Sequence, residues 1–139
     1  MINLIVVHCS ATKPSMDVGA EEIKQWHTLP KPKGKGWRDI GYHYIIKRDG
    51  TIEKGREDNV SGAHVRGHNT GSLGVCLVGG IDNSGKPDSN FTRSQYAALE
   101  RLLTDLSEAY GNPRITGHRM LDSGKPCPSF DIESWWNNR

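Results

Sequence analysis

Two histidines and one cysteine stand where a folded chain could bring them together. His8 ends the apolar run of residues 5–7, and His118 closes another short apolar run far along the chain. Cys127 follows His118 and lies between two prolines, which hold the backbone stiff and extended. Two imidazoles and one thiolate suit zinc, and a site with three protein ligands keeps a fourth position open for chemistry. The pattern therefore indicates one catalytic zinc ion.

Each of these residues also has a purely structural explanation. Taken alone, His8 or His118 is more often a hydrogen-bonded histidine at the end of a strand than a metal ligand. Cys9 alternates with His8 along its strand and points to the other face, so we expect it to be a small buried apolar residue. Cys76, inside an apolar run, is expected in the core for the same reason. The joint pattern of the three ligand types favours the zinc site.

The composition is that of a soluble, single-domain globular protein. The length of 139 residues suits one domain, and 35% hydrophobic with 24% charged residues excludes a disordered chain. A net charge of +2 is too small to indicate nucleic-acid binding, but it is compatible with a polyanionic surface such as a cell wall. No membrane-spanning run and no secretory signal are recognisable, so synthesis in the cytoplasm is expected. Three cysteines in such a chain argue against a disulfide framework.

Hydrophobic patterns predict an α/β fold, a mixed sheet with helices packed on it. Helices are expected after a cap at Asp17, after a capping box of Thr92 with Gln95, and near Asp131. Apolar or alternating runs between the helices predict strands. The strands expected are residues 2–7, 42–47, 51–53, 73–78 and 114–116.

Six segments, in order along nearly the whole chain, carry a family resemblance. They are Val7–Thr12, Gly41–Ile46, Gly62–His64, Asn69, Ser72–Val75 and Pro126–Pro128. Together they resemble the zinc-dependent N-acetylmuramoyl-L-alanine amidases, a superfamily that includes the peptidoglycan recognition proteins. The small bacteriophage lysozymes with amidase activity are most similar. The resemblance implies one amidase domain over residues 1–139, with a mixed, mostly buried sheet flanked by helices.

The resemblance also implies a reaction and the residues that carry it. The reaction is hydrolysis of the amide between N-acetylmuramic acid and L-alanine in peptidoglycan, which lyses the bacterial cell wall after release of the enzyme from the host cytoplasm. Lys125 would stabilise the oxyanion, and Tyr42 would orient water and assist proton transfer. His64 would lie in the cleft and bind substrate. The implied zinc ligands are His8, His118 and Cys127.

Alternative functions differ in what they require of these residues. A peptidoglycan-binding module without catalysis typically lacks the cysteine ligand, so the presence of Cys127, Tyr42 and Lys125 favours the enzyme. A structural zinc site would need a fourth ligand, for which His64 or His43 is available. A glycosidase would need two separated carboxylates, and no convincing pair is present.

Two departures from the phage relatives concern the loop before Cys127 and the first residues. The stretch from His118 to Cys127 is one residue longer, which places the extra residue within Met120–Gly124. The segment before His8 is shorter. Phage members of the family can also bind and inhibit the phage RNA polymerase, and no residue of this sequence can be assigned to that role. A monomer is expected.

Overall fold

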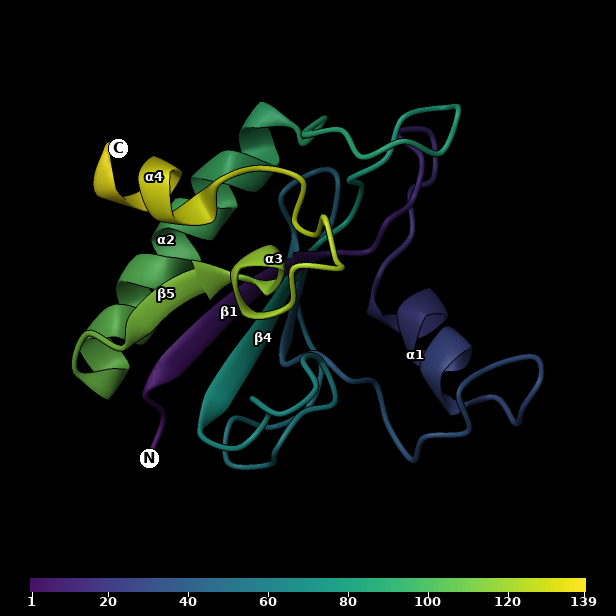
Figure 1. Ribbon diagram of the computed structural model, residues 1–139, viewed down its shortest axis with the longest axis horizontal. Helices are drawn as coiled ribbons and strands as arrows, with labels where there is room; N and C mark the ends of the chain where they lie inside the picture. Colours follow the sequence, from purple (N-terminus) through teal and green to yellow (C-terminus); the bar gives the residue numbers. More distant parts are fainter.

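Five strands form one mixed sheet in the computed structural model, which describes residues 1–139 (Figure 1). The strand order is β3-β2-β4-β1-β5. β4 pairs in parallel with β1 and β2, β1 pairs in parallel with β5, and only β2 and β3 are antiparallel. This confirms the predicted mixed sheet. The strands are β1 (Leu4–Cys9), β2 (Tyr44–Ile46), β3 (Ile52–Lys54), β4 (Ser72–Leu77) and β5 (Arg114–Gly117).

Four helices accompany the sheet, and the longest is the one that the sequence predicted best. The side chain of Thr92 accepts from the Gln95 amide, and the side chain of Gln95 accepts from the Thr92 amide, so the predicted capping box is confirmed. None of the helices combines the length and apolar character that crossing a membrane requires. The helices are α1 (Ala20–Thr28), α2 (Arg93–Tyr110), α3 (His118–Leu121) and α4 (Ile132–Asn137).

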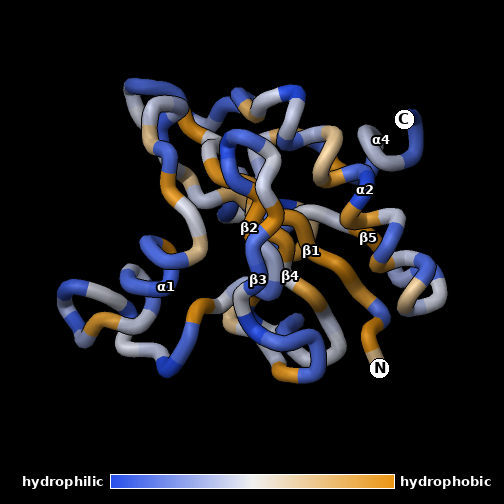
Figure 2. The backbone as a smooth tube through the Cα atoms, turned by 180° about the vertical axis from the view of Figure 1, so that it is seen from behind, coloured by the Kyte–Doolittle hydropathy of each residue, from blue (hydrophilic) through white to orange (hydrophobic).

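One face of the sheet, which we call the helix-covered face, packs against α2 and α4. In Figure 1 these two helices lie together to the left of the central strands, and Figure 2 shows hydrophobic positions gathered along the strands. Side chains on this face belong to one buried apolar cluster, because alternate residues of a strand share a face. The cluster includes Ile5, Val7 and Cys9 of β1, Leu73, Val75 and Leu77 of β4, and Leu99, Leu102, Leu103 and Leu106 of α2.

The opposite face, which we call the loop-covered face, is covered by residues 55–71 and by α1. Pairing of β1 with β4 sets Val6 beside Gly74 and His8 beside Cys76 on this face. A small apolar cluster joins Ile23 of α1 to Cys76. Because β1, β4 and β5 are parallel, their carboxyl ends meet at one edge. His8, near the end of β1, therefore lies close to His118, which directly follows β5.

Three details differ from the sequence prediction. Asp17 does not cap α1: the cap residue is Gly19, whose amide donates to the Glu22 carboxylate at 2.9 Å. The Glu53 carboxylate accepts from the next amide of the helix at 2.8 Å, so two other carboxylates satisfy the exposed amides and Asp17 is not needed. β2 begins only at Tyr44, and the short helix α3 was not predicted.

Candidate metal centre

Side chains of His8, His118 and Cys127 converge at the carboxyl edge of the parallel strands. Their candidate ligand atoms all lie within 4.8 Å of one another, and no other group of three or more His, Cys, Asp or Glu side chains is arranged in this way. The Nδ1 atoms of His8 and His118 are 3.1 Å apart. Two nitrogens bound to one tetrahedral zinc ion lie about 3.3 Å apart, so the spacing fits a shared cation. The three residues that the sequence singled out therefore form a possible metal site.

Backbone contacts hold the cysteine against the end of β1. The amide of Cys9 donates to Cys127 Sγ at 2.7 Å, and the amide of Arg119 donates to the Cys127 carbonyl at 2.8 Å. A Cβ atom on Gly117 would lie 2.9 Å from Pro128, so glycine at the end of β5 permits the close approach of this segment. The loop from α3 to Cys127 is thus closed by contacts at both of its ends.

Electrostatics keep the imidazoles neutral and available as ligands. Burial, together with the neighbouring His64 and His118 rings, holds the pKa of His8 well below its ordinary value. Burial also lowers the pKa of His118, and the charge of Lys125 adds to this effect. The contact with the Cys9 side chain and burial raise the pKa of Cys127 and outweigh the Cys9 amide, which lowers it, and binding of a metal ion would deprotonate such a thiol. This donor set fits zinc.

His64 lies on the loop-covered face and contacts the possible metal site through His8. Its Nδ1 is 2.8 Å from His8 Nε2, and its Nε2 is 3.0 Å from the Ser72 hydroxyl. Burial lowers its pKa to about 3. The ring also lines a cavity of about 340 Å³ with Trp37 and Arg66. Both ring nitrogens have partners within the protein, so neither is free to bind a substrate. Substrate binding by His64 stays a prediction.

Tyr42 and Lys125 border the three candidate ligands without joining them. The ring centroid of Tyr42 lies 5.2 Å from that of His8. Burial raises the pKa of Tyr42 well above its ordinary value, so its phenol keeps its proton at neutral pH. Lys125 is exposed in the turn before Cys127, where its charge acts on His118. The catalytic roles of Tyr42 and Lys125 stay predictions.

Comparison with known proteins identifies the family. The sequence profile of the N-acetylmuramoyl-L-alanine amidases matches residues 1–130, which include every residue of the site. The chain belongs to this amidase family. It is 52% identical over 132 residues to the endolysins of Klebsiella phage KP32 and Escherichia phage T7, which covers 95% of this chain and 83% of each relative. The solved N-acetylmuramoyl-L-alanine amidase LysC from Clostridium intestinale is 26% identical with a TM-score of 0.80, covering 99% of this chain and 87% of that one.

Neither histidine that could supply a fourth ligand to the candidate site has a free ring nitrogen. His43, one candidate for that position, is fully buried, and its Nε2 lies 2.8 Å from the Val60 carbonyl while its Nδ1 accepts from the Gly74 amide at 3.0 Å. His64 is engaged on both sides, as described above. The arrangement therefore disfavours a closed structural zinc site and leaves one coordination position for chemistry.

Two residues beside the candidate site have a structural importance that the sequence analysis did not predict. Ser72 and Gly74 belong to a family motif of the sequence, and they also form the surface on which His64 lies. Their signal was present in the sequence, because a serine and a glycine at alternate positions interrupt one face of an otherwise apolar strand. Cys9 is buried as predicted, but its amide also contacts Cys127.

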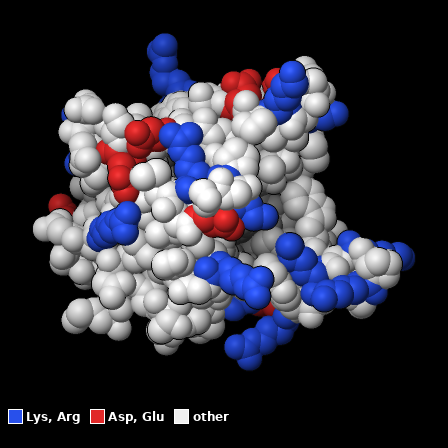
Figure 3. Space-filling view, in the orientation of Figure 1, with Lys and Arg blue, Asp and Glu red and all other residues white.

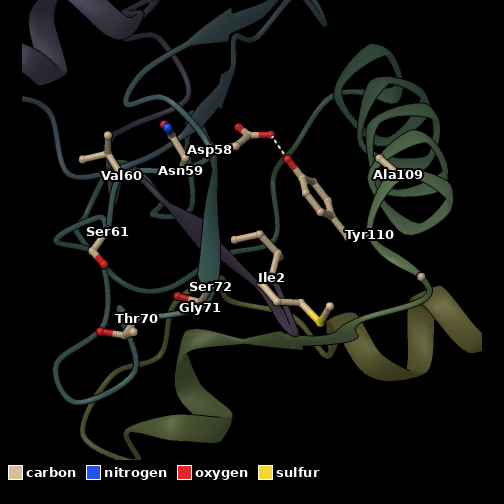
Figure 4. A pocket seen from close by; sticks show the side chains of 12 residues that line it. Ile2, Asp58, Asn59, Val60, Ser61, Thr70, Gly71, Ser72, Ala109 and Tyr110 are labelled. Atoms are coloured by element: carbon tan, nitrogen blue, oxygen red, sulfur yellow. Dashed lines mark hydrogen bonds between the residues drawn. The ribbon is translucent and has the colours of Figure 1, made fainter.

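A cavity larger than the one beside His64 lies away from the three candidate ligands. It measures about 760 Å³ and lies beside the amino ends of β1 and β4 and the end of α2 (Figure 4). Residues such as Ile2, Asp58 and Tyr110 line it, and Asp58 accepts a hydrogen bond from Tyr110 there. None of its lining residues belongs to the His8, His118 and Cys127 group. The larger cavity and the candidate metal ligands thus lie at different edges of the sheet. We place the candidate site at the carboxyl edge because metal-binding side chains converge there.

Proposed function

We propose that this protein is a zinc-dependent endolysin, an amidase that releases stem peptides from peptidoglycan by cutting the bond between N-acetylmuramic acid and L-alanine. The observation that carries the proposal is the convergence of His8, His118 and Cys127 in a chain of the amidase family. These three residues would hold one zinc ion. When bound, zinc supplies a Lewis acid that polarises the amide carbonyl and lowers the pKa of water. The amidase domain would comprise residues 1–139.

Tyr42 and Lys125 would have separate catalytic roles beside the zinc ion. Attack on the amide carbon places negative charge on the carbonyl oxygen, and the ammonium group of Lys125 would stabilise that charge. Tyr42 keeps its proton because it is buried, so it acts as a hydrogen-bond donor that orients the attacking water rather than as a base. Neither residue is a ligand in this scheme.

The cationic surface near the site suits an anionic polymer. Figure 3 shows lysines and arginines over the part of the molecule where Figure 1 places α1 and the loop after it. That loop ends at Trp37, which lines the same cavity as His64. Stem peptides carry carboxylates, so the loop would attract the polymer that the site cuts. The cations are Lys24, Lys31, Lys33, Lys35 and Arg38.

The cellular route follows from the kinship with phage endolysins. The protein would be made in the host cytoplasm and act on the cell wall after release. Binding to a phage RNA polymerase and a monomeric state stay predictions, to which no surface is assigned.

A digest of purified peptidoglycan with matched zinc analysis tests the proposed function. We expect new free amino groups on L-alanine, no new reducing sugar ends, and about one zinc ion per chain. Chelation should abolish turnover, and added zinc should restore it. New reducing ends would make the enzyme a glycosidase, the absence of both products would leave a binding module, and full turnover by the metal-free protein would refute the zinc assignment.

A further inference from the structure

A chain of three side chains runs from the possible metal site along the loop-covered face. His8 Nε2 lies 2.8 Å from His64 Nδ1, and His64 Nε2 lies 3.0 Å from Ser72 Oγ. The Ser72 hydroxyl in turn lies 2.6 Å from the His68 carbonyl oxygen and 3.1 Å from that of Asn69. His8, His64 and Ser72 are all buried. Burial therefore limits the competition of solvent for these hydrogen bonds.

Ser72, the last of these three side chains, sets the direction of every hydrogen bond in the series. Carbonyl oxygens only accept, so the single hydroxyl hydrogen of Ser72 points at the backbone, and Ser72 Oγ must accept from His64 Nε2. A neutral His64 protonated at Nε2 has a bare Nδ1, which accepts from His8 Nε2. His8, neutral in turn, then carries no hydrogen on Nδ1, the atom that faces His118 at 3.1 Å.

The reverse direction fails at the backbone. It would require the Ser72 hydrogen to point at His64, which would leave the hydroxyl oxygen and the His68 carbonyl oxygen 2.6 Å apart with no hydrogen between them. Two oxygen lone pairs at that distance repel each other. The backbone carbonyls thus select one of the two tautomers of His64.

A slot of small residues fixes the His64 ring in place. A Cβ atom on Gly74 would lie 2.6 Å from His64 Cγ, and one on Gly62 would lie 2.7 Å from His64 Cδ2. Asn69 Oδ1 accepts from the amides of both His64 and Val65, at 2.9 and 3.0 Å. The loop of residues 55–71 and strand β4 together hold the His64 ring so that each of its nitrogens contacts one partner.

We infer that His64 and Ser72 are positioning residues that fix the tautomer and orientation of His8, so that its Nδ1 is the atom presented to zinc. This inference rests on the proposed function for the identity of the ion. It also gives His64 a role other than substrate binding. Partners of this kind typically change metal affinity about 10- to 100-fold when they are removed.

Nuclear magnetic resonance of the zinc-loaded wild-type protein gives the first test. Long-range ¹H–¹⁵N correlation of the imidazoles should show the hydrogen of His64 on Nε2 and that of His8 also on Nε2. A hydrogen on His64 Nδ1 would overturn the inference. The measurement needs no variant, and the His64 assignment can also be made in the protein as purified. If zinc does not bind at all, the proposed ligand set fails while the tautomer result still tests the pair.

Zinc affinity of matched variants gives the second test. Ser72→Ala removes the acceptor of the His64 hydrogen, and competition with a chelator of known affinity should show zinc binding about 10- to 100-fold weaker. Tyr44→Phe, which removes a hydroxyl bonded to Asp58 at the other edge, should bind zinc like the wild type. Ser72→Thr keeps a hydroxyl and should restore most of the affinity. Unchanged affinity in a folded Ser72→Ala protein would refute the positioning role, and if that variant does not fold, the wild-type spectrum decides.

Discussion

The helix-covered face of the sheet is closed mainly by apolar side chains, whereas the loop-covered face is closed by imidazoles, glycines and backbone amides. On the first, α2 packs leucines against Val7 and Val75. On the second, His64 lies over Gly74 and contacts His8, and His43 accepts from the Gly74 amide. Burial of apolar surface has no direction, while each of these hydrogen bonds has one. The first face therefore stabilises the fold, and the second fixes atoms in place.

A single strand serves both purposes. Successive residues of β1 point to opposite faces, so Val7 packs under α2 while His8 points into the site. The site thus stands on a strand whose other side is locked by close packing, which limits its movement. From this comparison we expect substitutions on the loop-covered face and its carboxyl edge to reduce activity, and substitutions on the helix-covered face to reduce stability.

Loss of the thiolate should have the largest effect on activity. Cys127→Ser replaces the soft thiolate ligand with a hydroxyl, which binds zinc poorly, so we expect zinc binding and turnover to fall by more than the ~100-fold typical of a lost outer partner. Cys76→Ser changes a buried cysteine of β4 that is not a candidate ligand, so it is the matched control and should retain zinc. Zinc content and muropeptide release measure both effects. A fully active Cys127→Ser enzyme would contradict the ligand assignment.

Removal of the proposed oxyanion donor should reduce turnover while leaving the metal in place. Lys125→Ala should lower kcat by about 100- to 1000-fold, because one such donor is typically worth that much. The side chain is exposed, so the fold and the zinc content should not change. Tyr42→Phe should also retain zinc and lose turnover, since it removes only a hydroxyl. Near wild-type kcat in Lys125→Ala would show that another group stabilises the charge.

The same contrast explains what the sequence could predict. Strand and helix patterns on the helix-covered face follow from apolar periodicity, so β1, β4 and the capping box of α2 were predicted to within one or two residues. The three candidate ligands were predicted because each stands at the end of an element or between prolines. Their types and places are local features of the sequence.

Contacts on the loop-covered face could not be predicted in this way. The contact of His64 with Ser72 depends on how residues 55–71 fold back over β4, and no periodicity encodes that path. Aspartate is a residue type that often caps helices, so the sequence favours Asp17 as a cap. In the structure, the first amides of α1 donate to the carboxylates of Glu22 and Glu53 instead. Tertiary contacts thus decide among several side chains that are each chemically suitable.

A substitution that leaves a cavity in the core of the helix-covered face should reduce stability without altering catalysis. Leu103 is fully buried in the main cluster, and Leu103→Ala should lower the free energy of unfolding by about 2–5 kcal/mol. Urea unfolding measures this loss. Well below the unfolding transition, zinc content and kcat of the folded protein should equal those of the wild type. Leu29→Ala, at an exposed leucine, is the matched control. A lower kcat in Leu103→Ala would show that the two faces are not independent.

The smallest effect should come from Asp58, a loop carboxylate that accepts hydrogen bonds from Tyr44 and Tyr110 at the amino edge of the sheet. Burial raises the pKa of this carboxyl, but hydrogen bonds from Lys54, Tyr110 and Tyr44 outweigh burial and hold the pKa below its ordinary value. A carboxylate whose pKa is lower in the folded than in the unfolded state stabilises the fold at pH values above its unfolded-state pKa of about 3.9. This contribution is lost as the pH falls through the folded-state pKa.

Asp58→Asn should therefore be less stable than the wild type at pH 7 by about 1 kcal/mol, a modest figure because the group is partly exposed. Urea unfolding at pH 7, 5 and 3 should show this difference shrinking towards the acid end. Asp49→Asn, an exposed carboxyl bonded only within its own turn, controls for the loss of one charge. Turnover should not change, because Asp58 lines the cavity far from the candidate ligands. A stability difference that is the same at all three pH values would mean that the charge of Asp58 contributes nothing, and that its shape alone supports Tyr44 and Tyr110.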